Sequence, residues 1–258
     1  MKKKKSKVKG KKLIKVKSKK RMSKIFSERI SSGIENFDKL MEGGFIKYST
    51  NTLVGGSGSG KTILATQFLI EGLKRGEKCL YITFEEKKEQ FYSNMLKFNW
   101  DLATYENKGS FIFLEYSPAK VKTMLEEGGG AIEAIILDKK VSRLVIDSIT
   151  SFALLFRDEL SKREAALALF NTIKRWSCTS LLTLEQDPTE IREAASKSLE
   201  FESDSIILLY FVREKRKRER YLEVLKMRGT NHSKEIYKLS IDKAGIAVDR
   251  NSTVSPIR

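Results

Sequence analysis

The sequence predicts an α/β protein with a mainly parallel sheet flanked by helices and antiparallel strands at the C-terminal end. Two observations favour this class. Short apolar segments without polar alternation, such as 79–84 and 143–146, take turns with segments of helical periodicity such as 61–75. Unalternating apolar strands are typical of strands that are buried on both faces of a sheet. Strands that take turns with helices along the chain are typical of a parallel sheet.

The elements of the parallel part follow in order along the chain. Residues 50–54 are β-prone and lead into a Gly-rich turn, and residues 61–75 carry apolar side chains at helical spacing until Gly76. A Gly triplet at 128–130 interrupts the chain before a further helix. Strands are expected at 79–84, 111–116, 143–146 and 180–184, and helices at 89–98, 131–137 and 162–176.

The C-terminal part has a different pattern. Two strand-like runs, 205–212 and 221–227, flank a turn at 213–220 with six basic residues among eight. Two shorter runs, 236–241 and 246–248, follow. Consecutive strands that are joined by short connections predict antiparallel additions to the sheet.

The positive charge is concentrated in a Lys-rich tail. The chain of 258 residues has 50 Lys and Arg against 33 Asp and Glu, and residues 1–24 hold fourteen of the basic residues and no acid. We expect residues 1–24 to be disordered, since like charges repel and there is little to bury. Residues 25–258 are expected to form one domain. The tail, Lys2 to Lys24, favours nucleic acid or an anionic membrane surface as a partner, unless it serves only solubility.

Several classes of protein are excluded by composition. The longest apolar run, Ile206 to Val212, has seven residues, against about 18 for a membrane span. No apolar stretch follows the basic start, so a secretory signal is not indicated. Two cysteines and a single histidine cannot form a disulfide scaffold or a His-rich metal site. A soluble cytoplasmic protein without a transmembrane segment is therefore expected.

A phosphate-binding loop is the strongest signal. Residues 55–62 read GGSGSGKT, fit G-x-x-x-x-G-K-[ST], and stand between the predicted strand and helix. Backbone amides of such a loop and the helix N-terminus face phosphate oxygens. Lys61 would contact the β- and γ-phosphates, and Thr62 is a hard oxygen ligand for Mg²⁺. The candidate nucleotide-binding residues of the loop are Gly55, Gly56, Ser57, Gly58, Ser59, Gly60, Lys61, Thr62 and Ile63.

Acidic residues follow three predicted strands. Asp147 ends an apolar strand and would hold Mg²⁺ with Thr62, although an isolated strand-end Asp more often makes a local turn. Glu85 and Glu86 follow the strand at 79–84. If that strand lies next to the P-loop strand, one of these carboxylates could act as general base. On spacing alone, a solvated charge cluster is an equal alternative. Glu185 and Gln186 follow the strand at 180–184.

These residues together resemble the RecA-like ATPases, most closely the KaiC-type branch found in archaea and bacteria. The resemblance covers about residues 30–248. The matching segments are Ser32-Gly33-Ile34, Phe37-Asp38-Lys39-Leu40, Gly43-Gly44-Phe45, Thr66-Gln67-Phe68-Leu69, Phe84-Glu85-Glu86, Ile146-Asp147-Ser148 and Lys226-Met227-Arg228-Gly229-Thr230-Asn231-His232.

The resemblance implies a RecA-like P-loop NTPase core that binds ATP and Mg²⁺ and assembles as a homo-oligomer, a hexameric ring in this family. Glu85 and Glu86 would be the catalytic carboxylate pair, and Glu185-Gln186 stands where RecA-like proteins place a γ-phosphate sensor. Lys226 and Arg228 would reach the nucleotide of a neighbouring subunit, like an arginine finger, and His232 would lie near the nucleotide.

The function favoured by these observations is Mg²⁺-dependent ATP hydrolysis in a regulatory or signalling switch whose protein client is unknown. A DNA-binding recombinase-like ATPase is one alternative, supported by the Lys-rich tail and the basic turn. An autokinase or protein kinase of KaiC type is another. The clock proteins of this branch carry two such cores, whereas the resemblance here covers one, so a clock role is not predicted.

Overall fold

The computed structural model describes residues 28–117, 119–120, 122–123, 130–189, 202–214 and 216–254. The predicted Lys-rich tail at 1–24 lies outside this part of the chain. The strands are β1 (Arg29–Ile30), β2 (Phe45–Ile46), β3 (Thr50–Gly55), β4 (Cys79–Thr83), β5 (Phe111–Glu115), β6 (Arg143–Asp147), β7 (Thr179–Glu185), β8 (Ser205–Glu214), β9 (Lys217–Met227), β10 (Ile236–Asp242) and β11 (Gly245–Val254). The helices are α2 (Phe37–Leu40), α3 (Lys61–Lys74), α4 (Lys88–Leu96), α5 (Leu102–Asn107), α7 (Gly130–Lys139), α8 (Ile149–Ala153) and α9 (Glu159–Arg175).

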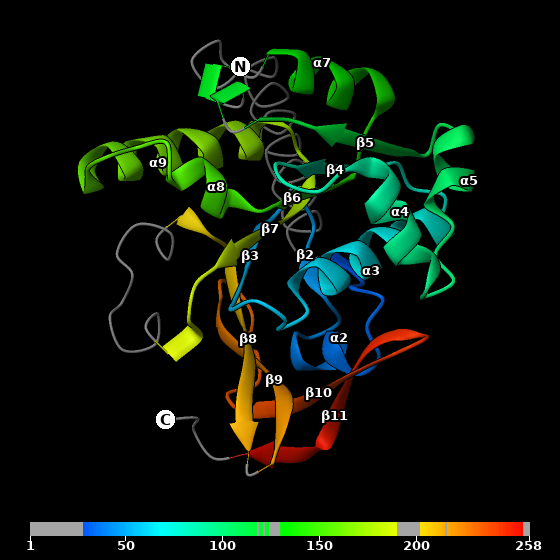
Figure 1. The fold of residues 1–258 in the computed structure, drawn as a ribbon, viewed down its shortest axis with the longest axis vertical. Helices are drawn as coiled ribbons and strands as arrows, with labels where there is room; N and C mark the ends of the chain where they lie inside the picture. The colour runs from blue at the N-terminus through cyan, green and yellow to red at the C-terminus, as the bar shows by residue number, and fades with distance from the viewer. Residues whose placement is uncertain are drawn as a thin grey trace, which may run out of the picture.

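A nine-stranded sheet of order β11-β10-β9-β8-β3-β7-β6-β4-β5 forms the centre of the fold (Figure 1). Strands β3 to β8 pair in parallel, and β9, β10 and β11 extend the sheet by antiparallel pairing. The predicted fold class is therefore confirmed. In one respect the expectation was wrong: β8 is not an antiparallel addition, because it pairs in parallel with β3.

Two hydrophobic clusters lie on the two faces of the sheet. Figure 1 shows the helices that lie over the sheet. On one face, α2 to α5 pack against the sheet, and on the other face α7 to α9 do so. The three central residues of β6 are apolar without alternation because they face both clusters. Val145 belongs to the first cluster, whereas Leu144 and Ile146 belong to the second.

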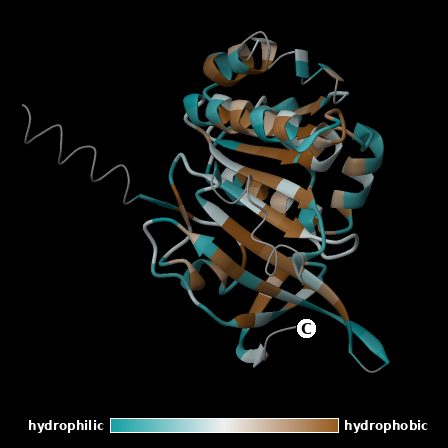
Figure 2. Ribbon diagram, turned by 90° about the vertical axis from the view of Figure 1, so that its left-hand side faces the viewer, coloured by the Kyte–Doolittle hydropathy of each residue, from teal (hydrophilic) through white to brown (hydrophobic). Residues whose placement is uncertain are grey.

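The charged turn expected at 213–220 is wrong, because both strands continue into it. Strands β8 and β9 pair as far as Glu214 and Lys217, so nearly all of the basic segment is a two-stranded ribbon. Glu219 forms an ion pair with Lys217 of the same strand and another, at 3.2 Å, with Lys238 of β10, and Glu214 accepts a hydrogen bond from Tyr221 across the hairpin. Figure 2 shows this end of the hairpin as a hydrophilic projection from the body.

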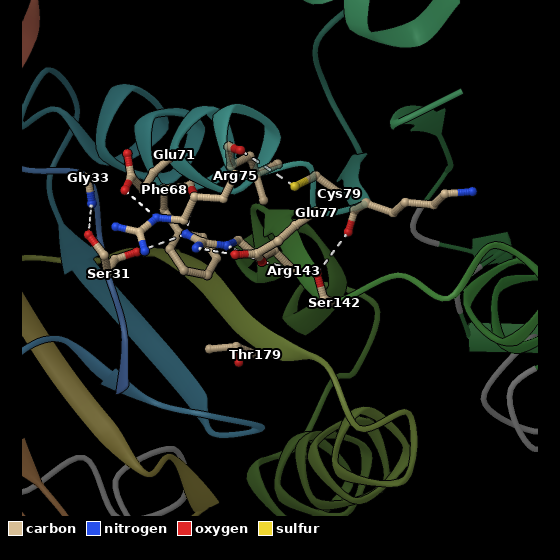
Figure 3. A network of polar contacts seen from close by, with 12 residues as sticks. Ser31, Gly33, Phe68, Glu71, Arg75, Glu77, Cys79, Ser142, Arg143 and Thr179 are labelled. Atoms are coloured by element: carbon tan, nitrogen blue, oxygen red, sulfur yellow. Dashed lines mark hydrogen bonds and ion pairs between the residues drawn. The ribbon is translucent and has the colours of Figure 1, made fainter. Parts of the chain in front are cut away.

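Arg143, the first residue of β6, connects this strand to α3, to the turn before β4 and to the segment after β1 (Figure 3). Its side chain is 1% exposed and donates two hydrogen bonds of 2.8 Å to the Glu77 carboxylate. It also donates to the carbonyl oxygens of Ser31 and Phe68, each at 2.8 Å. Because Phe68 belongs to α3 and Asp147 ends β6, this buried guanidinium fixes the P-loop helix against the strand of Asp147.

Among the described residues, no helix has both the length and the apolar composition that crossing a membrane requires. The short elements β1, β2, α2, α5 and α8 were not predicted. Each has only two to six residues, which is too short for periodicity to stand out from the surrounding sequence.

Candidate active site

The C-terminal ends of β3, β4, β6 and β7 meet at one edge of the sheet, where ligands bind in open α/β folds. A cavity of about 360 Å³ opens there, within the size range of ligand pockets. It is lined by Ser57, Gly58, Gly60, Lys61, Thr62, Ile63, Thr83, Glu85, Glu86, Asp147, Ser148, Glu185, Arg220 and Ile241. Most of the predicted loop residues, Asp147 and both glutamates are therefore brought together.

The P-loop turns directly into α3. Gly60 precedes the helix with φ of 105°, a backbone conformation that residues other than glycine rarely adopt. Lys61 donates to the carbonyl oxygens of Gly55 and Gly56 at 2.7 and 3.0 Å, and its Nζ lies 3.9 Å from the Glu185 carboxylate. Burial lowers the pKa of Lys61, and the neighbouring carboxylates partly oppose that effect. A phosphate would stabilise this buried cation further.

Asp147 is held by three hydroxyl groups. Thr62 Oγ1 and Tyr81 OH each donate to Oδ2 at 2.7 Å, and Thr183 Oγ1 donates to Oδ1. Burial and the adjacent Asp147 charge raise the pKa of Tyr81, so its hydroxyl remains a donor. The Thr62 hydroxyl and the Asp147 carboxylate are hard oxygen ligands, and this donor set fits Mg²⁺ that keeps most of its water and binds phosphate.

The two glutamates lie in different surroundings. Glu85 is exposed and accepts a hydrogen bond from Ser151 at the start of α8. Glu86 is half-buried and accepts from Asn94 of α4 at 3.2 Å. Burial raises the pKa of Glu86, and the charge of Asp147 adds to that effect.

The expectation that the strand before these glutamates lies beside the P-loop strand is wrong. Strands β7 and β6 stand between β3 and β4. Glu85 and Glu86 nevertheless reach the cavity, because all four strands are parallel and end at the same edge.

One side of the cavity is closed by the C-terminal strands. Arg220 of β9 donates from Nε to the carbonyl oxygen of Gly58 at 3.0 Å. Its guanidinium lies 4.3 Å from the centre of the Phe211 ring, and Ile241 of β10 lines the same wall. A flat guanidinium and an aliphatic side chain suit the faces of a planar ring.

Lys226, Arg228 and His232 do not reach this cavity. Lys226 pairs with Ile206, three residues before the position that pairs with Gly55, so it lies about 10 Å back along the sheet. Lys226 donates to the carbonyl oxygen of Ser203, and an Arg228 nitrogen lies 3.8 Å from an Asp204 oxygen.

His232 is buried near the same end of the sheet. Its two ring nitrogens lie 2.8 Å from the Ser233 carbonyl oxygen and 3.1 Å from Lys234 Nζ. All three candidates, Lys226, Arg228 and His232, thus lie away from the P-loop of their own chain.

The residues of the site that the sequence analysis missed include Tyr81, Thr183 and Arg220. The first two are hydroxyl residues inside apolar strands, and that contrast was the available signal. Its meaning depends on β4 and β7 being the strands on either side of β6, which the sequence did not disclose. Arg220 was assigned to a turn, where nothing distinguished it from its basic neighbours.

Comparison with known proteins agrees with this geometry. Residues 30–253 match the family model described as "ATPase: KaiC". The circadian clock protein KaiC3 of Synechocystis sp. (strain PCC 6803) is 33% identical over 230 residues, which are 86% of this chain and 45% of that protein. This chain therefore spans about half the length of that relative.

Two proteins of Pyrococcus horikoshii match over nearly their whole length. The UPF0273 protein PH0284 is 32% identical over 235 residues, 86% of this chain and 94% of that protein. The crystal structure of the KaiC-like protein PH0186 superimposes with a TM-score of 0.75 at 33% identity, covering 86% of this chain and 99% of that one. With a matching family model, a matching fold and a P-loop that faces Asp147, the chain belongs to the KaiC family of ATPases.

Proposed function

We propose that this protein hydrolyses ATP with Mg²⁺, and that residues 25–258 act as one ATPase domain. The observation that carries the proposal is the 2.7 Å hydrogen bond between Thr62 and Asp147 at the start of the P-loop helix. It joins two hard oxygen ligands for Mg²⁺ on the same cavity as Lys61. The loop from Gly55 to Ile63 would bind the phosphates.

The chain supplies the remaining groups for transfer of the γ-phosphoryl group to water. Mg²⁺, when bound, neutralises charge that develops on the phosphate oxygens. Lys61 adds a positive charge, and we assign Glu85 as the base that takes the proton from water. Glu86, which is more buried and is held by Asn94, would support the water rather than deprotonate it. Arg220 and Ile241 would flank the nucleobase of the bound ATP.

Assembly as a homo-oligomer, a hexameric ring by resemblance, would complete the site. Lys226 and Arg228 lie at the opposite end of the strands from their own P-loop. By the resemblance, basic side chains in that position would reach the nucleotide of a neighbouring copy and stabilise the transferred phosphoryl group. His232 would approach the same nucleotide.

ATP turnover per protomer, measured against protein concentration with Mg²⁺, tests this proposal. We expect a rate that rises with concentration and then saturates, because a neighbour completes the site. A flat rate across the range from monomer to oligomer would contradict the role of Lys226 and Arg228. Absence of turnover at every concentration would contradict hydrolysis by this protein alone.

Variants separate the roles within the site. Lys61→Ala should lose nucleotide binding or turnover, and Lys74→Ala, at the exposed end of the same helix, is the matched control. Glu85→Gln should keep ATP binding but lose hydrolysis by about 10²–10⁴-fold, the range of a general base. If Glu86→Gln causes that loss and Glu85→Gln does not, the assignment of the base is wrong.

A regulatory role in the cytoplasm stays a prediction from the resemblance and composition. The projecting hairpin also favours testing nucleic acid as a partner, because Arg213, Arg216 and Arg218 are exposed on it. Turnover that rises on addition of DNA and falls steeply with salt would support the recombinase-like alternative. Labelled phosphate retained on the protein would support the kinase alternative.

A further inference from the structure

We propose that Tyr81 and Thr183 are positioning residues that orient the Asp147 carboxylate toward the metal of the bound nucleotide. This inference rests on the proposed function. It assigns a role to two residues that the sequence analysis did not single out. They belong neither to the P-loop, nor to the acidic residues at the strand ends, nor to the basic residues at the end of β9. The observation behind it is the set of three hydroxyl donors on one carboxylate.

The two positioning hydroxyls come from the strands on either side of β6, which carries Asp147. Tyr81 belongs to β4 and Thr183 to β7, and the order of these strands in the sheet is β7-β6-β4. In the register, Val145 pairs with both Tyr81 and Leu181. Side chains two residues apart point to the same face of a sheet. Tyr81, Asp147 and Thr183 therefore point to the face that carries α3 and Thr62.

Packing fixes the direction of the Tyr81 hydroxyl. The side chain is 1% exposed, and its ring stacks on Phe113 at 5.5 Å between centroids, with 7° between the ring planes. Phe91 of α4 contacts the ring at 4.5 Å. The ring has little room to turn away, so the O–H is held on Asp147 by the core itself. Thr183 is fully buried and lies inside β7.

The arrangement of donors leaves the carboxylate available to a metal-bound water. A carboxylate offers about four lone-pair sites, and three are used by Thr62, Tyr81 and Thr183. A hydroxyl oxygen keeps lone pairs while its hydrogen is donated, so Thr62 would offer its oxygen to Mg²⁺ and still donate to Asp147. Tyr81 and Thr183 then keep one hydrogen bond on each oxygen of the carboxylate.

The donors are also suited to a cation site by their charge. Hydroxyl groups are neutral, so they fix the orientation of Asp147 without cancelling its negative charge. A lysine or arginine in the same place would orient the carboxylate but would repel the metal. Partners behind a ligand that fix its direction commonly contribute to metal affinity in this way.

The test measures metal binding without turnover. Mn²⁺ is titrated, with detection by electron paramagnetic resonance, into the full chain saturated with a non-hydrolysable ATP analogue. For Tyr81→Phe, which keeps the ring and removes the O–H, we expect the Mn²⁺ dissociation constant to rise about 10-fold. Affinity for the analogue in EDTA should stay at the wild-type value, because Lys61 and the loop bind the phosphates.

Two matched variants control for structure. Tyr92→Phe removes a hydroxyl from the same aromatic cluster, where Tyr92 contacts Phe111 and Phe113, and should bind Mn²⁺ like wild type. Thr183→Val should weaken Mn²⁺ binding, whereas Thr183→Ser, which restores the hydroxyl, should not. The Thr183 pair carries the test if Tyr81→Phe does not fold.

The outcomes are distinguishable. The inference is overturned if Tyr81→Phe and Thr183→Val bind Mn²⁺ as tightly as Tyr92→Phe. It is also overturned if these variants weaken binding of the analogue in EDTA as much as they weaken binding of Mn²⁺, since the hydroxyls would then support the whole pocket. If the wild-type protein binds no Mn²⁺ with the analogue, the proposed function itself fails, and the inference falls with it.

Discussion

The buried pair of Arg143 and Glu77 makes a quantitative prediction for the variant Glu77→Gln. Glu77 accepts two hydrogen bonds of 2.8 Å from a guanidinium that is 1% exposed (Figure 3). Glutamine keeps the shape and one oxygen but removes the negative charge, so Arg143 retains a buried and incompletely compensated charge. Breaking such pairs costs about 3–5 kcal/mol, and the part of Glu77 that reaches solvent places our expectation at about 3 kcal/mol.

The effect should depend on pH in a defined direction. The Arg143 guanidinium lowers the pKa of the Glu77 carboxyl below its ordinary value of 4.5. A depressed pKa in the folded state contributes stability above the ordinary pKa, and that contribution is lost as the pH falls through the folded-state value. The difference between wild type and Glu77→Gln should therefore be full at about pH 7 and shrink on acidification below the ordinary pKa.

Urea unfolding at about pH 7 and at a pH below the ordinary pKa of a glutamate measures this difference. Thermal unfolding should show a decrease of about 6–12 °C in Tm at neutral pH. Glu71→Gln is the matched control, because Glu71 pairs with Arg75 on the surface of the same region. Such exposed pairs contribute about 0.3–0.5 kcal/mol. If Glu77→Gln loses no more stability than Glu71→Gln, or loses as much in acid as at neutral pH, the reasoning is refuted.

Three further predictions concern α3 and the site. Gly72→Ala should lower the Tm although alanine favours helices by about 1 kcal/mol, because its Cβ would lie 2.5 Å from Arg143 Nε; a raised Tm would contradict this contact. The rate of ATP turnover should decrease in acid at a pH above the usual range for a glutamate. The reason is that the pKa of Glu86 is raised, so its charged form is lost as the pH drops. Glu86→Gln should remove this decrease from the pH–rate profile. Arg220→Ala should raise the KM for ATP with kcat unchanged, because contact with the base is the same in ground and transition states; an equal loss in kcat would place Arg220 in catalysis.

The sequence alone determined the longer elements of the parallel part and the position of the phosphate loop. The strands at 79–84 and 143–146 and the helix at 61–75 appear within one to two residues of their predicted ends. Apolar runs, helical spacing and the glycines of the loop act over a few neighbouring residues, so their effect can be read locally. The residues of the loop itself, with Lys61 and Thr62, were identified for the same reason.

The tertiary structure decided which side chains meet. Strand order is set by packing between segments far apart in the chain, and no local pattern placed β7 and β6 between the P-loop strand and Glu85. The same order brought the hydroxyls of Tyr81 and Thr183 onto Asp147. Pairing across the β8–β9 hairpin likewise converted an expected turn into a wall of the cavity with Arg220. These contacts depend on long-range burial and register, and that is why only the folded chain disclosed them.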